Sequence, residues 1–177
     1  MDKLKENGMT ACAITDHGVM CGVVEFYKAL KANGIKPVIG CEVYVAVPGR
    51  NDKTARVDDG SHHLVLLAKD YEGYKNLMKL CSMGFTEGFY YKPRIDKEIL
   101  REHSKGLIGL SACLAGEIPS LMLKGDVEGA EKIALEYKEI FDEGDFYIEL
   151  QSNGVEVQDR LNHELAEMAR RLDIPLV

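Results

Sequence analysis

The stretch from Thr10 to Ala46 constrains the fold of this chain more than any other part of the sequence. It begins and ends with short apolar runs rich in β-branched residues, which are typical of buried strands. Between these runs, residues 19–33 carry apolar side chains near helical spacing, and Gly34 follows as a helix stop. This order of strand, helix and strand predicts a right-handed crossover between two parallel strands.

Side chains that can bind metal lie at or near the ends of both predicted strands. Asp16 and His17 follow the first strand, and Glu42 lies inside the second. In α/β folds the chemistry collects where strands end. Two plainer interpretations stay open, in which Asp16 caps the next helix or Glu42 faces solvent. Because the neighbours of Glu42 are apolar on both faces, its carboxylate needs a polar partner or a metal, and we favour a functional site.

The composition indicates a protein with a sizeable core and little attraction for nucleic acid of its own. The 177 residues suffice for one domain, and 46% of them are hydrophobic. A formal net charge of −7 does not suit a surface that wraps DNA by itself. No apolar run approaches the roughly 20 residues of a membrane helix, and the N-terminus lacks a signal-peptide pattern. Five cysteines without a C-x-x-C pair indicate reduced, cytoplasmic thiols, not a zinc finger.

The rest of the chain alternates short apolar strands with amphipathic helices, which predicts a parallel α/β sheet or barrel. The remaining expected strands cover residues 64–68, 107–110, 145–151 and 174–177, and the expected helices cover 1–9, 70–83, 95–103, 117–123, 126–142 and 155–172. Residues 47–60 form the one long polar loop. Because the last apolar strand stops at Val177, we expect the chain to be a fragment of a larger fold.

Two further segments carry potential metal ligands. His62 and His63 precede the strand over 64–68, where they form either a solvated pair or a metal-binding pair. Beside strands that already offer Asp16, His17 and Glu42, ligation by one of them is favoured, and we expect His63 because it abuts the strand. Cys113 follows the strand over 107–110, a position where a buried structural thiol is the commoner outcome.

The loop over 84–94 is rich in aromatic and basic residues. Tyr91, Lys92 and Arg94 form either an anion-binding rim for phosphate or DNA, or a packed loop in which long side chains cover apolar surface. The sequence leaves these two interpretations equally open.

Six segments, taken together and in order, resemble the polymerase-and-histidinol-phosphatase (PHP) domain at the N-terminus of the alpha subunit of bacterial replicative DNA polymerase III. They read Ala-Ile-Thr-Asp-His-Gly, Ile-Gly-Cys-Glu-Val-Tyr-Val, His-His-Leu-Val-Leu-Leu-Ala-Lys-Asp-Tyr-Glu-Gly-Tyr-Lys-Asn-Leu, Tyr-Lys-Pro-Arg-Ile-Asp, Leu-Ser-Ala-Cys-Leu-Ala-Gly-Glu-Ile-Pro and Phe-Tyr-Ile-Glu-Leu-Gln. The resemblance is collinear from about Met9 to Val177. Each motif alone is weak, but the ordered set is specific.

The resemblance implies a distorted β/α barrel of the TIM-like PHP type, with a cluster of divalent ions at the strand ends. Asp16 and His17 stand at the family's T-D-H ligand motif, and Glu42 stands at its strand glutamate. His63 stands at the ligand before the third strand, and Cys113 at a position that many polymerase members fill with Cys. Zinc, manganese and magnesium suit such donors. Asp16, His17 and Glu42 are then the expected catalytic residues.

The sequence departs from the family pattern in three places. The family's first strand, which bears His-x-His, and its last motif, Asn-Asp-x-His, are not in this sequence. Residues 151–154 read Gln-Ser-Asn-Gly where relatives often have Gln-x-His-Gly. We therefore expect a single PHP-domain fragment over residues 1–177, truncated at both ends, with an incomplete metal site and weak or no hydrolysis by itself.

The resemblance also implies the function of the parent protein, which is template-directed DNA synthesis on a primer-template together with other polymerase III subunits. Within it, this domain is expected to be a metal-dependent phosphoesterase that removes nucleotides in the 3′–5′ direction. The alternative is an inactive structural platform that docks a proofreading subunit or other polymerase domains. A free-standing phosphatase of the histidinol-phosphate type is a third possibility, but Tyr-Lys-Pro-Arg and Cys-Leu-Ala-Gly-Glu-Ile-Pro resemble the polymerase branch.

Overall fold

The structure of the chain is a computed structural model that describes residues 2–54 and 61–177. Its elements are α1 (Asp2–Glu6), β1 (Ala11–Ile14), α2 (Val23–Ala32), β2 (Lys36–Ala46), β3 (Ser61–Ala68), α3 (Tyr71–Thr86), β4 (Arg94–Ile95), α4 (Lys97–His103), β5 (Leu107–Leu110), α5 (Glu117–Leu123), α6 (Val127–Ile140), β6 (Phe146–Tyr147) and α7 (Glu156–Leu172). The first residue of the helix expected over 1–9, and residues 55–60 of the loop expected over 47–60, lie outside the described residues.

The expected strand–helix–strand unit is confirmed in β1, α2 and β2. β1 and β2 pair in parallel, with Ala11 opposite Lys36 and Ile14 opposite Ile39. α2 begins at Val23, later than its sequence pattern predicts. It ends before Gly34, whose φ of +71° is a conformation that favours glycine.

The sheet is mixed, which corrects the parallel sheet that the alternation of elements predicts. Its strand order is β1-β2-β3-β5-β6, with β4 also paired to β2. β3 runs antiparallel to both of its neighbours, β2 and β5. Parallel neighbours need a crossover connection, usually a helix, and none lies between β2 and β3 among the described residues.

Three short segments also differ from the strands that the sequence predicts. Arg94 and Ile95, expected in a loop and a helix start, form β4 in parallel with Tyr44 and Val45 of β2. The strand expected over 145–151 is limited to β6. Residues 174–177 contribute an isolated bridge from Leu176 to Ile148 in place of a strand.

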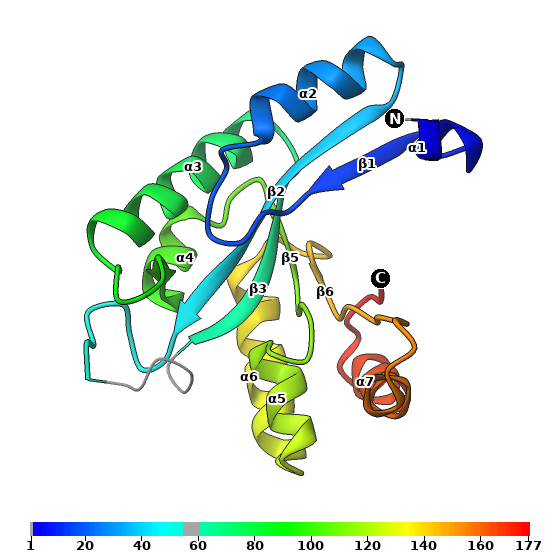
Figure 1. The fold of residues 1–177 in the computed structure, drawn as a ribbon. Coiled ribbons are helices and arrows are strands. Elements are labelled where there is room, and N and C mark those ends of the chain that lie inside the picture. Colours follow the sequence, from blue (N-terminus) through cyan, green and yellow to red (C-terminus); the bar gives the residue numbers. More distant parts are fainter. Residues whose placement is uncertain (1, 55–60) are drawn as a thin grey trace.

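The two faces of the sheet have different roles. Figure 1 shows α2 and α3 running along the same side of β2, and alternate residues of β2 and β3 are buried on the helix side. These residues are Cys41, Val43, Val45, Leu64 and Leu66. The alternation of strand side chains places Glu42, Tyr44 and His63 on the opposite face.

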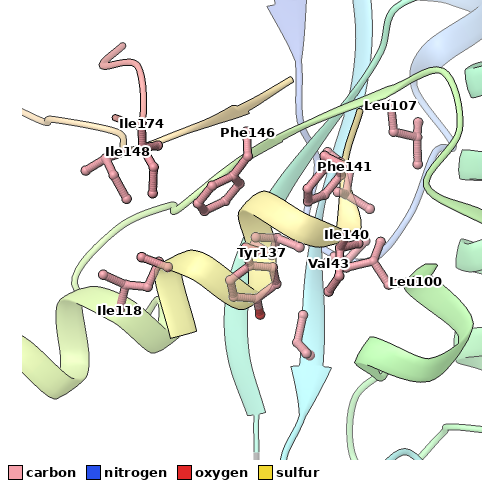
Figure 2. Packing of buried hydrophobic residues seen from close by; sticks show 14 of the residues in the cluster. Val43, Leu100, Leu107, Ile118, Tyr137, Ile140, Phe141, Phe146, Ile148 and Ile174 are labelled. Carbon is pink, nitrogen blue, oxygen red and sulfur yellow. The ribbon is translucent and has the colours of Figure 1, made fainter. Parts of the chain in front are cut away.

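A second part of the core lies between β5, β6 and α6 (Figure 2). The rings of Tyr137 on α6 and of Phe141 just after its end stack on Phe146 of β6, with centroids 5.4 and 5.9 Å away. This packing fixes the position of β5 and therefore of the loop that follows it, which carries Cys113. No helix in the described part of the chain is long and apolar enough to span a membrane.

Candidate metal centre

The pairing of β1 with β2 continues beyond Ile14 and brings His17 beside Glu42. The Glu42 N–H donates to the Asp16 carbonyl at 3.0 Å, and the Gly18 N–H donates to the Glu42 carbonyl at 2.9 Å. His17 and Glu42 form a parallel bridge. Gly18 has a φ of +67°, and a Cβ there would lie 2.8 Å from Cγ of Pro93, so this turn requires glycine.

His63 joins this pair through the antiparallel register of β2 and β3. It lies opposite Tyr44 and on the same face as Glu42. The distance between His63 Nδ1 and Glu42 Oε1 is 2.5 Å, and His17 Nδ1 lies 3.8 Å from the same oxygen. One ligand atom from each of the three residues lies within 4.8 Å of the others. The His17 side chain is 59% exposed, against 16% for Glu42 and 19% for His63, so His17 forms the open side.

Cys113 lies on the other side of His63. The backbone N–H of His63 donates a hydrogen bond to the Ala115 carbonyl at 3.1 Å, and this bond ties the loop after β5 to β3. Ala112 has a φ of +61°, a conformation that is uncommon outside glycine and turns the chain just before Cys113. Cys113 Sγ lies 3.5 Å from His63 Nδ1.

The Asp16 carboxylate is not among the three grouped ligand atoms. Its Oδ2 lies 3.2 Å from the place that a Cβ on Gly22 would occupy, beside the start of α2. The Asp16 carbonyl pairs with β2, because it accepts hydrogen bonds from the Glu42 N–H and from Cys41 Sγ at 3.0 and 3.2 Å. The structure therefore brings together His17, Glu42, His63 and Cys113, and leaves the Asp16 carboxylate apart.

Tyr44 lines the centre, and sequence reasoning missed it. Its ring centroid is 6.2 Å from that of His17 and 5.2 Å from that of His63. The signal was its place two residues after Glu42, which puts both side chains on one face of β2. Lys92 Nζ lies 4.7 Å from the Tyr44 ring centroid, so this lysine stands at the edge of the centre.

Arg94 does not stand at such an edge, so it does not fit the anion-binding rim, one of the two interpretations that the sequence leaves open for Lys92 and Arg94. It is 3% exposed, and its guanidinium donates to the carbonyls of Gly88, Arg50 and Asp52 at 3.1, 3.2 and 2.7 Å. These donors are already used within the protein, so Arg94 fits the packed-loop interpretation.

The centre holds a positive charge where a cation would bind. Hydrogen bonds to Cys113 and to Glu42 outweigh burial and raise the pKa of His63 to about 9. The same contacts with His63 lower the pKa of Cys113 and of Glu42. A protonated imidazole therefore lies between a carboxylate and a sulfur, and a metal ion can replace this proton. Two imidazoles, a carboxylate and a thiol are also donors that divalent transition metals accept, so the residues fit a metal centre.

Comparison with protein families and curated proteins gives one consistent result. The model of the PHP domain family matches residues 1–153. Proteins named DNA polymerase III subunit alpha are 45% identical in Treponema pallidum (98% of this chain, 15% of that protein) and 49% identical in Thermus aquaticus (94% and 14%). A protein of the same name in Chlamydia muridarum is 53% identical over 84% of this chain and 12% of its own length. The chain thus spans about 15% of the length of the curated relatives it matches.

Solved structures share the fold at low sequence identity. An amidohydrolase from Chromobacterium violaceum has a TM-score of 0.59 at 13% identity, and a protein from Bifidobacterium adolescentis that is described as a metal-dependent phosphoesterase has 0.55 at 11%. Each alignment covers 99% of this chain and 78% of the other. The expected TIM-like class of fold is therefore confirmed. The match of the family model to residues 1–153 shows that the chain belongs to the PHP domain family.

Proposed function

We propose that residues 1–177 are a single PHP-domain part of a cytoplasmic DNA polymerase III alpha subunit, and that their metal centre hydrolyses phosphodiesters at the 3′ end of a primer strand. The observation that carries this proposal is the convergence of His17, Glu42, His63 and Cys113 from two strands and from the loops after β1 and β5. The proposed partners are the DNA primer-template and the other subunits of the polymerase. DNA synthesis itself belongs to the parent protein in this proposal.

Each residue of the centre has its own proposed task. Glu42, His63 and Cys113 hold a divalent ion, for which the thiol favours zinc, while manganese and magnesium are the other candidates. His17 is the most exposed of the donors and faces the side from which a substrate arrives. When bound, divalent ions supply Lewis-acid polarisation of a phosphate ester and stabilise the charge that develops on its oxygens. Asp16 orients Glu42 through its carbonyl, and Lys92 attracts DNA phosphates.

Neighbouring histidines on opposite faces of β3 supply a matched pair of variants. His63 faces Glu42, whereas His62 Nδ1 lies 3.4 Å from the Ala115 carbonyl and away from the three grouped ligand atoms. We expect His63→Asn to lower the zinc affinity of this chain by at least about 10-fold, and His62→Asn to leave it unchanged. Zinc bound per chain is measured by competition with a chromophoric chelator. An absence of bound zinc, manganese and magnesium in the unmodified chain would contradict the proposal.

Hydrolysis is tested in the full polymerase subunit that carries this chain, because we expect the chain alone to cleave weakly or not at all. His63→Asn is expected to abolish 3′–5′ degradation of a labelled single-stranded primer and to leave DNA synthesis intact. His62→Asn is again the control. Metal binding without degradation by the unmodified subunit would favour the alternative function, a structural platform.

One observation favours the platform as a second candidate. An apolar groove of about 610 Å³ lies between α2 and α3, away from the metal centre. Its lining includes Val23, Tyr27, Ile39 and Tyr71, of which Tyr27 is 48% and Tyr71 73% exposed. Exposed aromatic side chains of this kind are enriched at protein–protein interfaces.

A further inference from the structure

Tyr91 is an exposed aromatic residue in the loop between α3 and β4, and the proposed function does not use it. It is 63% exposed and lies at the tip of a tight turn. In this turn Tyr90 and Lys92 form an antiparallel bridge, and the Tyr90 N–H donates to the Lys92 carbonyl at 3.1 Å. The φ of Tyr91 is +58°, a conformation that is uncommon outside glycine. Such a conformation persists only where the surrounding structure imposes it, and residues of this kind gather at functional sites.

The neighbours of Tyr91 hold its ring in place and leave much of it uncovered. The rings of Tyr91 and Tyr90 are nearly perpendicular, with centroids 4.6 Å apart and an angle of 72° between their planes. The Arg94 guanidinium lies 5.1 Å from the Tyr90 ring centroid, and the backbone carbonyls that it contacts fix it in turn. Because Tyr91 is supported from this side and exposed on the other, its ring surface is free to stack on a ligand.

The residue that follows Tyr91 reaches the edge of the metal centre. Lys92 Nζ lies 4.7 Å from the ring centroid of Tyr44, whose ring in turn stacks beside that of His17. No ion pair within residues 2–54 or 61–177 includes Lys92. Consecutive Cα atoms are about 3.8 Å apart. A phosphate bound at Lys92 therefore brings the base of the same strand to Tyr91.

The charge of the chain favours a contact that does not depend on phosphates. With a formal net charge of −7, this chain gains little from a general attraction to DNA. Stacking of a nucleobase on an aromatic ring is independent of net charge and accepts every base, because each base has a π face. It requires an unpaired base whose face is accessible. A single strand therefore fits this surface, and a duplex does not.

We propose that Tyr91 stacks on an unpaired base of the DNA strand whose phosphate lies at Lys92, and that it thereby selects single-stranded DNA for the metal centre. This inference rests on the proposed function, which supplies the position of the phosphodiester. It adds a contact to the base and a preference for unpaired strands.

A fluorescence titration of the 177-residue chain tests the stacking directly, because the sequence contains no Trp. Tyr91→Trp introduces a single indole, whose emission is quenched when a base stacks on it. We expect quenching by a short oligothymidine strand, in EDTA and at low salt, and none by an abasic strand of equal length. Tyr71→Trp is the matched control, because Tyr71 is 73% exposed and also has a lysine, Lys75, at 5.3 Å from its ring centroid. It lies on α3 away from the centre, and we expect no quenching there.

Binding of the same strands is then compared among variants by fluorescence anisotropy of a label on the DNA. Tyr91→Ala is expected to weaken binding of oligothymidine by at least about 5-fold, while Tyr91→Phe keeps the ring and the affinity. Neither substitution is expected to change binding of the abasic strand, which has the same phosphates but no bases. Tyr71→Ala is expected to leave both affinities unchanged.

Equal oligothymidine affinity of the unmodified chain and Tyr91→Ala would overturn the inference and assign the exposed ring to a protein contact. An equal loss on the abasic strand would also overturn it, because Tyr91 would then act only by holding the turn that carries Lys92. No binding of oligothymidine by the unmodified chain would have the same consequence. If Tyr91→Ala does not fold, equal quenching of Tyr91→Trp by the two strands decides against stacking. Metal binding and primer degradation test the proposed function separately, so stacking without degradation would overturn that function alone.

Discussion

Asp96 connects the loop after β2 to the start of α4. Its Oδ1 accepts a hydrogen bond from the Ile99 N–H at 3.1 Å and so caps α4. Its Oδ2 accepts from the Arg50 N–H at 3.0 Å and lies 2.9 Å from the Arg50 guanidinium. Burial alone would raise the pKa of Asp96, but these hydrogen bonds outweigh it and hold the pKa below its usual value. Asp96 therefore stabilises the folded state above its ordinary pKa of about 3.9, and this contribution is lost as the pH falls through the lowered pKa.

Asp96→Asn keeps a side-chain cap but removes the charge that pairs with Arg50. We expect it to lower the free energy of unfolding by about 1–3 kcal/mol at pH 7. We also expect it to remove part of the loss of stability that the unmodified chain shows below about pH 4. Urea unfolding at pH 7 and pH 3 measures both effects. Glu98 pairs with the same Arg50 but is 75% exposed, so Glu98→Gln is expected to change stability by less than about 0.5 kcal/mol. Equal effects of the two variants at pH 7 would refute this role for Asp96.

The site residues differ in how far the sequence alone could place them. His17 and Glu42 follow from the parallel pairing of two strands, and alternation along β3 separates His63 from His62. The direction of the Asp16 carboxylate depends on how the turn after β1 enters α2, which no local pattern encodes. The sequence leaves Arg94 open between a rim cation and a packed side chain, because the carbonyls that it reaches come close only in the folded chain.

At the scale of elements, α3 contains two buried glycines with different surroundings. A Cβ on Gly73 would lie 1.8 Å from the Gly106 carbonyl oxygen, because the start of α3 packs directly on the turn before β5. A Cβ on Gly84 would lie 3.5 Å from Pro93, which is an ordinary contact. Gly106 has a φ of +73°, so the turn against Gly73 is itself fixed by glycine.

Gly73→Ala and Gly84→Ala form a matched pair within one helix. We expect Gly73→Ala to lower the free energy of unfolding by about 2 kcal/mol or more, because backbone must move to admit the methyl group. Gly84→Ala is expected to be neutral or to stabilise by up to about 1 kcal/mol, the gain in helix propensity over glycine. Urea unfolding monitored by circular dichroism compares them. Similar destabilisation by both would mean that α3 does not pack on the β5 turn as described.

The helices were easier to predict than the pairing of the strands. α5 spans Glu117–Leu123 as its sequence pattern predicts, and α3 extends only to Thr86 beyond the expected end at Met83. Helical spacing and capping are local, so a single segment carries the signal. The direction of β3 and the existence of β4 depend on partners distant in sequence, and a two-residue strand such as β4 has no periodicity to detect.

Across the whole molecule, one contiguous hydrophobic cluster joins the β2–β3 region to α7. It runs from Cys41 of β2 to Ile174 after α7, and it includes Leu165 and Met168 of α7. The alternation of apolar strands and amphipathic helices predicts such a core, and the family resemblance predicts its barrel-like arrangement. Neither predicts the mixed strand directions, because β2 and β3 share an apolar pattern that either direction would satisfy.

This shared core predicts that the described chain unfolds as one cooperative unit. The Leu165 side chain is 2% exposed, so Leu165→Ala is expected to lower the free energy of unfolding by about 2–5 kcal/mol and to move a single transition. Leu123→Ala, at a position that is 41% exposed, is the control and is expected to shift stability by less than about 0.5 kcal/mol. Scanning calorimetry measures both, and a calorimetric enthalpy equal to the van't Hoff enthalpy is the expected signature. Two separate transitions, with Leu165→Ala displacing only one of them, would mean that α7 and the β2–β3 region belong to independent folding units.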